Sequence, residues 1–432
     1  MLVAVSDMDQ RASGFATLLE RVEAASPVDA IDVAADELAA RLGARDVTLL
    51  VADYGGRDIV RLGRAAGATG GRTYGSENAE AVVVTGSVYE EVLRRQQVVV
   101  RTLDTGTRVT APVTVRGDVI GAMDLLLDTP PTPEQLAEIA GIGHLLGHVV
   151  VVNRRYTDLF EWGQRTTDLS LSAEIQRRLL PPAFTCESGQ FTFAGWLEPA
   201  ATVGGDTFDY ALDRSTLHLS ITDAAGHDVE AAMLATVLVG ALRNARRAGK
   251  DLLAQVVSAD DELTAYSSKG RFVTGQVVRI DLENRTAVVV NAGHPNPLRL
   301  RAGRVEEIDL AVDRPFGLER DRSFRVQSLA LEPGDRIVFV TDGMLERHAA
   351  ELDVHTTLRD TAHLHPREVV HALGAAVLRV TGGNLRDDAT VFCVDWYGGS
   401  DDRVARHGAS QDRASTWPRT GRTEDIPAQT GP

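Results

Sequence analysis

Residues 199–209 read Pro-Ala-Ala-Thr-Val-Gly-Gly-Asp-Thr-Phe-Asp, and this stretch decides the fold. Two glycines precede Asp206, and a second carboxylate, Asp209, follows three residues later. Because glycine lets the backbone approach a neighbouring segment closely, the stretch predicts a tight turn that carries an acid. One turn of this kind is normally a solvated loop, so its meaning depends on the turns that follow it.

Three more acidic turns lie downstream. Each adjoins an apolar run that predicts a buried strand: Asp223 follows residues 217–221, Asp342 follows 337–340, and Asp387 and Asp388 precede 391–394. A carboxylate placed where a buried strand emerges is unfavourable unless something compensates its charge. A divalent cation does so, and several Asp side chains with few His or Cys suit Mg²⁺ or Mn²⁺. Two such ions can share a water, lower its pKa and position a phosphoryl group for in-line attack.

The order of these motifs resembles the metal-dependent PPM phosphatases, specifically the bacterial SpoIIE/RsbU branch of the type 2C group. Further matching segments lie between and before the acidic turns. They are Glu174–Pro181, Ala292–Pro297, Pro315–Leu318 and Leu331–Asp335. The last acidic turn matches over Asp387–Thr390. The resemblance implies an αββα sandwich, with two sheets between helix layers, over residues 190–397.

The resemblance also implies a role for each motif residue. Asp206 and Asp223 match the pair that contacts two metal ions, and Ala224 matches a position whose backbone carbonyl coordinates. Asp342 and Asp387 match the remaining carboxylate ligands, and the adjacent Asp388 is an alternative to Asp387. The resemblance thus assigns catalysis to Asp206, Asp223, Asp342 and Asp387, with two Mn²⁺ or Mg²⁺ ions.

Other polar residues of these motifs are interpreted as supporting the site. Asp209 and Glu346 are candidates for residues that contact the metal ligands and not the metal ions. His227 and His294 are interpreted as structural and not as proton donors, although His227 could support a ligand by hydrogen bonding. The branch has Gly after this His, whereas this chain has Asp228. Because an acid is favourable in the first turn of a helix, we interpret Asp228 as a helix cap.

The first region, residues 13–152, predicts a separate α/β domain. Helical spacing over 15–25 and 27–42 is followed by predicted strands at 47–53, 98–101, 109–115 and 119–127. Arg116-Gly117-Asp118 predicts a hairpin turn between the last two. The element order and the segment Ala111–Asp128 resemble a GAF domain, which implies a sensor. No residue pattern identifies a ligand for it.

A long helical segment connects the two regions. Thr132-Pro133-Glu134-Gln135 predicts its start, and Pro181-Pro182 its end. Residues 153–182 form the predicted helical linker. It either packs on its own domains or forms a coiled-coil homodimer that joins sensor to output. Residues 399–432 have few apolar side chains and predict a disordered tail.

Composition excludes several classes of function. The chain of 432 residues has 45 Lys and Arg against 61 Asp and Glu, a net charge of −16, which argues against nucleic-acid binding. The two cysteines, Cys186 and Cys393, exclude a disulfide scaffold and are interpreted as small buried side chains. The N-terminus lacks a signal-peptide pattern, and the apolar run Leu145–Val152 is too short to span a bilayer, so we expect a cytoplasmic protein without membrane contact.

The expected activity is hydrolysis of phosphoserine or phosphothreonine on a protein. The resemblance implies a small STAS-type anti-sigma-factor antagonist as the phosphorylated substrate. One alternative is a non-catalytic signalling scaffold that binds a partner through the phosphatase-like fold. Another is a ligand-binding sensor whose second domain only dimerises. The complete set of Asp residues argues against both alternatives.

Overall fold

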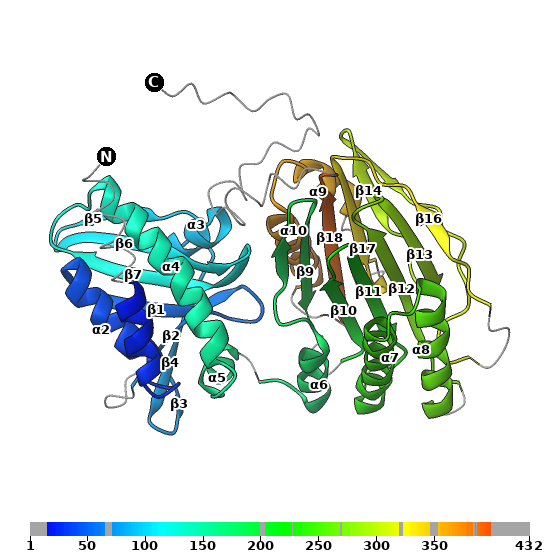
Figure 1. Ribbon diagram of the computed structural model, residues 1–432, viewed down its shortest axis with the longest axis horizontal. Helices are drawn as coiled ribbons and strands as arrows, with labels where there is room; N and C mark the ends of the chain where they lie inside the picture. Colours follow the sequence, from blue (N-terminus) through cyan, green and yellow to red (C-terminus); the bar gives the residue numbers. More distant parts are fainter. Residues whose placement is uncertain are drawn as a thin grey trace. The chain divides into compact units, whose positions relative to one another are not determined.

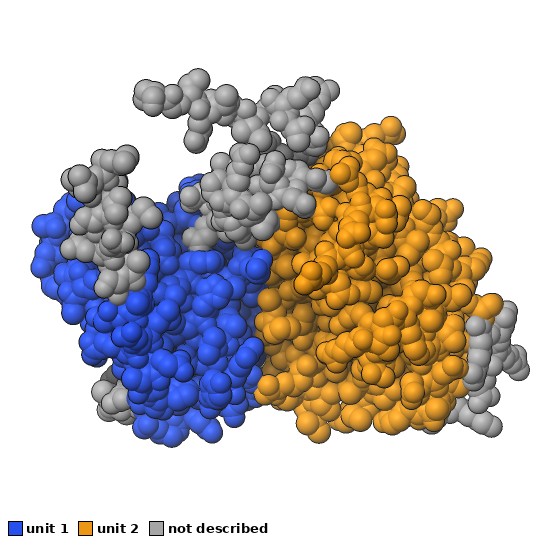
Figure 2. All heavy atoms as spheres, viewed as in Figure 1, with its two compact units in different colours: residues 1–168, 411–415 blue, residues 169–410, 416–432 orange. Residues whose placement is uncertain are grey.

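The computed structural model describes residues 15–64, 71–166, 168–198, 204–226, 228–267, 270–318, 323–345, 353–382, 385 and 387–398. These residues divide into two compact units, the first ending at Asp168 and the second beginning at Leu169 (Figure 2). The predicted disordered tail, His227 and Glu346 lie outside the described residues.

In unit 1 the described residues form one antiparallel sheet of seven strands in the order β3-β4-β2-β1-β7-β6-β5 (Figure 1). A helix at 15–24 precedes the elements that carry labels. These are α2 Ala30–Leu42, β1 Ala44–Ala52, β2 Asp58–Arg64, β3 Arg72–Tyr74, β4 Glu77–Val83, α3 Val88–Arg95, β5 Val99–Leu103, β6 Gly106–Val115, β7 Asp118–Leu127, α4 Pro133–Asn153 and α5 Leu159–Gln164. Both early helices, the four predicted strands and the hairpin turn are confirmed, whereas β2, β3, β4 and α3 were not predicted.

Alternating side chains divide the core of unit 1 between the two faces of its sheet. Leu49 and Val51 of β1 pack with the helix at 15–24, α2 and α4, whereas Leu50 packs with α3. Helix α4 lies so close to β6 that a Cβ at Gly147 would stand 2.8 Å from the carbonyl oxygen of Thr114. By length and composition, α4 is the one helix in the described part of the chain that could cross a membrane, yet it contributes to this core.

The prediction of one continuous helical segment from residue 133 to residue 180 is wrong. Helix α4 ends at Asn153, α5 covers Leu159–Gln164, and α6 covers Leu171–Leu179. Each restart has a hydroxyl side chain that accepts a backbone N–H: Thr157 accepts from Leu159, and Ser170 accepts from Ala173. The predicted linker is therefore divided, with α5 in unit 1 and α6 in unit 2.

Unit 2 contains a five-stranded sheet, β10-β11-β12-β13-β16, and a six-stranded sheet, β15-β14-β17-β18-β9-β8, among the described residues. Its strands are β8 Thr185–Glu187, β9 Phe191–Glu198, β10 Asp206–Leu212, β11 Thr216–Ala224, β12 Val273–Asp281, β13 Thr286–Ala292, β14 Leu298–Arg301, β15 Arg304–Glu307, β16 Gln327–Leu329, β17 Asp335–Val340 and β18 Ala389–Trp396. The helices besides α6 are α7 Val229–Arg247, α8 Leu252–Tyr266, the short 3-10 turn η1 Asp342–Met344, α9 Val354–Asp360 and α10 Pro366–Thr381.

Aromatic side chains from both sheets fill the space between them. Phe193 of β9 lies with its ring centroid 6.0 Å from that of Phe208 of β10 and 5.3 Å from that of Phe392 of β18. Helices α7 and α8 pack on the outer face of the five-stranded sheet, and α9 and α10 on that of the six-stranded sheet (Figure 1). The predicted αββα sandwich is confirmed.

The cysteines have no disulfide partner. Cys393 is fully buried, and burial raises the pKa of its thiol far above the ordinary range. Cys186 is half-buried. The predicted role of a small buried side chain is confirmed for Cys393 and holds only in part for Cys186.

Candidate active site

The five-stranded sheet brings the first two predicted ligands together. Asp206 is the first residue of β10, and it stands directly opposite Asp223, near the end of β11, in the antiparallel register. Both carboxylates therefore lie at one end of this sheet. Asp206 is buried, whereas Asp223 is half-buried.

The six-stranded sheet contributes the other ligands from the junction of two neighbouring strands. Strand β17 ends at Val340, opposite Val391 of β18, so the segments carrying Asp342 and Asp388 adjoin. The hydroxyls of Thr341 and Thr390 both donate to Asp206 Oδ2, at 2.7 and 2.6 Å. Asp206 thus joins the two sheets. The role of these threonines was not predicted, although each stands inside a recognised motif.

Asp388 is engaged in holding the backbone. Its buried Oδ2 accepts from the backbone N–H groups of Gly205 and Asp206, at 3.0 and 3.3 Å, and from Gln176 Nε2 at 2.5 Å. The neighbouring Asp387 is half-buried, and its Oδ1 accepts the backbone N–H of Asp388 at 2.9 Å. Of these two adjacent acids, Asp387 is the less buried and Asp388 the one that holds the backbone of Gly205 and Asp206. Asp387 therefore stays the expected ligand.

The electrostatics of the cluster fit a cation. Burial, followed by the charges of Asp223 and Asp388, raises the pKa of Asp206 well above its usual range. Burial, followed by Asp342, Asp387 and Asp388, raises the pKa of Asp223 to about 7. All the charged groups among these main influences are carboxylates. A divalent cation would relieve both the burial cost and the repulsion.

The carboxylates nevertheless do not form a closed set of ligands. Among the residues that the structure describes, no three His, Cys, Asp or Glu side chains have the mutual spacing of a metal cage. Asp342 is exposed at the start of η1, at the outer side of the cluster. Like charges repel, so these carboxylates push one another apart. A bound cation attracts all of them and would draw these side chains together.

Two glycines let backbone segments pack closely together at the site. A Cβ at Gly205 would stand 2.7 Å from the carbonyl oxygen of Ala224, the predicted backbone ligand. A Cβ at Gly343 would collide with the carbonyl oxygen of Asp388. Both positions therefore require glycine, because a neighbouring backbone segment lies too close for a side chain.

Helix α6 is bonded directly to the site, which the sequence analysis did not predict. Gln176 Nε2 donates to the backbone oxygen of Asp206 at 2.8 Å as well as to Asp388. At the C-terminal end of α6, Arg243 Nη2 of α7 donates to the oxygen of Leu179 at 2.6 Å and to Asp209 Oδ1 at 2.9 Å. Asp209 therefore anchors α7 and, through Arg243, α6.

The other predicted polar residues have structural contacts. His294 is buried, its Nδ1 lies 3.0 Å from Thr274 Oγ1, and burial lowers its pKa to about 3. It is therefore neutral at pH 7, in agreement with a structural role. Asp228 is the N-cap of α7 and accepts the backbone N–H of Ala231 at 3.0 Å, which confirms the predicted cap.

Comparison with known proteins gives one family. The family model described as "Stage II sporulation protein E (SpoIIE)" matches residues 213–397. Phosphoserine phosphatase RsbP of Bacillus subtilis is 22% identical over 188 residues, which are 42% of this chain and 46% of the relative. Phosphoserine phosphatase RsbU of the same organism is 19% identical over 234 residues, 53% of this chain and 70% of the relative.

Similar solved structures include the RsbU and RsbW domains of Rv1364c from Mycobacterium tuberculosis. That structure is 25% identical, has a TM-score of 0.44 and covers 49% of this chain and 61% of its own. The chain spans less than half the length of RsbP. Asp223, Asp342, Asp387 and Asp388 lie within the matched range, and Asp206 lies just before it. Residues 213–397 therefore match the SpoIIE family of domains, and the relatives that share this match include two named phosphoserine phosphatases.

Proposed function

We propose that this protein is a metal-dependent protein serine/threonine phosphatase. The observation that carries the proposal is the cluster of mutually repelling carboxylates at the ends of both central sheets. Two Mn²⁺ or Mg²⁺ ions, when bound, would neutralise phosphoryl oxygens and acidify a water. Asp206, Asp223, Asp342 and Asp387 would hold them, with the Ala224 carbonyl.

The surrounding residues orient these ligands. Thr341 and Thr390 both donate to Asp206 Oδ2, which fixes the orientation of this carboxylate. Asp388 fixes the backbone of Gly205 and Asp206, and Gln176 fixes Asp388. Such supporting hydrogen bonds limit the movement of the ligands, which is what a precise metal site requires.

The test compares Mn²⁺-dependent hydrolysis of p-nitrophenyl phosphate by the wild type, Asp223→Asn and Asp342→Asn. Both variants should lose at least about a hundredfold in rate, because each removes a ligand charge. Asp309→Asn, an exposed carboxylate elsewhere in unit 2, is the matched control and should retain the wild-type rate. Equal, metal-independent rates in all four proteins would overturn the proposal and favour a non-catalytic scaffold.

We further propose that the substrate is a phosphorylated regulatory protein, a STAS-type anti-sigma-factor antagonist, acted on in the cytoplasm. Support comes from the motif resemblance and from the relatives named phosphoserine phosphatase. Capture of a phosphoprotein by the Asp223→Asn variant, identified by mass spectrometry, tests this. A captured partner without phosphoserine or phosphothreonine would count against it.

Unit 1 is proposed to be a GAF-like sensor that controls the phosphatase, and the chain to form a homodimer. The antiparallel sheet of unit 1, with helices on both faces, supports the first part. Deletion of residues 1–168 should change the phosphatase rate. A concentration-independent monomer mass in light scattering would refute the dimer.

A further inference from the structure

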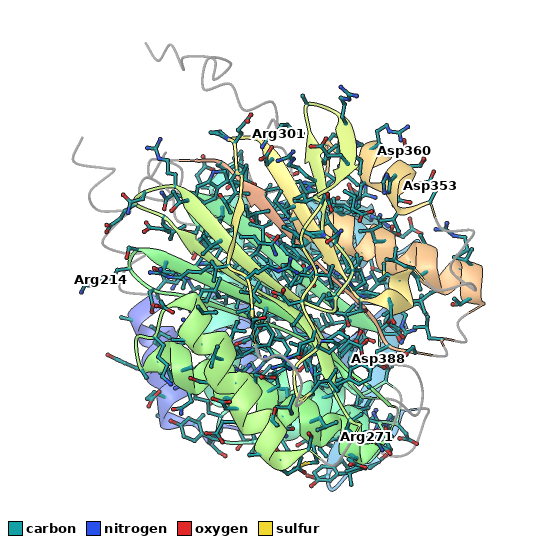
Figure 3. All side chains as sticks on the ribbon, turned by 90° about the vertical axis from the view of Figure 1, so that its right-hand side faces the viewer. Arg214, Arg271, Arg301, Asp353, Asp360 and Asp388 are labelled. Carbon is teal, nitrogen blue, oxygen red and sulfur yellow. The ribbon has the colours of Figure 1, made fainter. Side chains whose placement is uncertain are left out.

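Arg271 places a positive charge beside the loop that follows Asp223. It lies just before β12, and its Nη1 donates to the backbone oxygen of Ala225 at 3.2 Å. Ala225 comes directly after Ala224, the proposed backbone ligand. A Cβ at Gly226 would collide with the same Nη1. The loop and the guanidinium therefore fit each other closely. Figure 3 labels Arg271 and Asp388 on unit 2.

Two acids at the start of α7, the N-cap Asp228 and Glu230 of the first turn, hold this guanidinium. Arg271 Nη2 donates to Asp228 Oδ2 at 3.1 Å and to Glu230 Oε2 at 2.9 Å. With the bond to Ala225, three of the five guanidinium N–H donors have acceptors among the described residues. The Arg271 side chain keeps 28% of its surface exposed. It therefore remains accessible to an anion from solvent.

The chemistry of the proposed reaction supplies a reason for such a cation. A phosphoserine side chain brings a charge of about −2 to a site built from carboxylates. The positive charge of divalent ions bound there would be largely neutralised by the Asp residues that hold them. A further fixed cation beside the site therefore adds attraction, and a guanidinium suits phosphate because it presents paired N–H donors.

We propose that Arg271 binds the substrate phosphate at the rim of the carboxylate site, and that Asp228 competes with that phosphate for its guanidinium. This inference rests on the proposed phosphatase function. Asp228 Oδ2 already accepts from Arg271 Nη2 at 3.1 Å, so a phosphate that takes this donor must displace the carboxylate. Loss of the Arg271 guanidinium and loss of the Asp228 charge should therefore have opposite effects on phosphate binding.

The experiment measures KM for a phosphoserine peptide and for p-nitrophenyl phosphate, and the inhibition constant of inorganic phosphate, with Mn²⁺ present. Arg271→Ala should raise all three constants roughly tenfold, because one charge-assisted contact to phosphate is lost. Arg271→Lys should recover part of the loss. Arg214→Ala is the matched control, since Arg214 is exposed in the β10–β11 turn, at the other end of those strands (Figure 3).

Asp228→Asn keeps a cap acceptor for α7 but removes the competing charge. It should lower the three constants about two- to threefold, and it should have no effect in the Arg271→Ala background. Equal lowering in both backgrounds would show a general field effect and overturn the competition. A rise confined to the peptide in Arg271→Ala would overturn the phosphate contact.

Direct titration of the Mn²⁺-loaded protein with inorganic phosphate separates this inference from the proposed function. If the wild type hydrolyses neither substrate, the phosphatase proposal fails, whereas phosphate binding that is lost in Arg271→Ala would still show the contact between Arg271 and phosphate. If hydrolysis is normal while Arg271→Ala matches the Arg214→Ala control in every constant, the inference alone fails.

Discussion

Asp223→Asn should stabilise the metal-free protein while abolishing its response to metal. The folded Asp223 carboxyl has a pKa of about 7, raised by burial and by Asp342, Asp387 and Asp388, against an ordinary value of 3.8. The folded state therefore binds one proton more than the unfolded state between about pH 4 and pH 7. Stability falls as pH rises through this window and stays low above it. About three pH units at roughly 1.4 kcal/mol each set an upper limit of about 4 kcal/mol at pH 8.

The assay is urea unfolding in EDTA at pH 4.5, 6 and 8, repeated at pH 8 with saturating Mn²⁺. The Asn variant should gain up to about 4 kcal/mol over the wild type at pH 8 and little at pH 4.5. Mn²⁺ should stabilise the wild type but not the variant, because ligands that bind only the folded state raise its stability. Asp309→Asn should stay within about 0.5 kcal/mol throughout. A variant less stable than the wild type at pH 8 would refute the reasoning.

Three further substitutions test packing and positioning. Gln176→Leu should lower the unfolding free energy by about 2–4 kcal/mol and weaken Mn²⁺ binding in calorimetry, whereas Glu174→Ala on the same helix should do neither. Arg243→Met should cost about 1.5–3 kcal/mol in urea unfolding, because Asp209 loses its bonds to Arg243 and keeps Arg246 at 3.2 Å; retained stability would contradict this. Gly147→Ala should lower the stability of unit 1 by about 1–3 kcal/mol, but Gly141→Ala, with 3.7 Å to its nearest neighbour Phe15, should not.

The strands of unit 1 that were predicted differ physically from those that were not. Strands β6 and β7 are almost continuously buried and joined by a turn with positive φ at Arg116 and Gly117, so both signals lie in the local sequence. Strand β3 is fully exposed, and β4 mixes buried and exposed positions. These two strands form because β3 pairs with β4 and β4 pairs with β2, which local periodicity does not show.

The connecting region shows the opposite error. Apolar residues continue at helical spacing across both breaks, so periodicity alone predicts one helix. The breaks are marked by Thr157 and Ser170, which accept N–H groups from the start of the next helix. A hydroxyl residue in front of each apolar run is the local signal that marks where α5 and α6 begin.

For the site, motif order predicted which carboxylates lie near one another, because each follows or precedes a strand of a central sheet. It did not predict what holds them. The contacts of Asp206 with Thr341 and Thr390, and those of Gln176 with Asp388, join residues far apart in the chain. Only the packing of the two sheets and α6 brings them together, so no local pattern could show them.

The contacts of α6 fix where an independently folding phosphatase fragment can begin. A fragment starting at residue 190, the predicted domain boundary, would lack the amide that donates to Asp388 and Asp206, and Arg243 would lose the Leu179 carbonyl. A fragment starting at Leu169 keeps all of these bonds together with the Ser170 cap. Purified proteins of these two lengths should therefore differ in metal affinity even though both contain every proposed ligand.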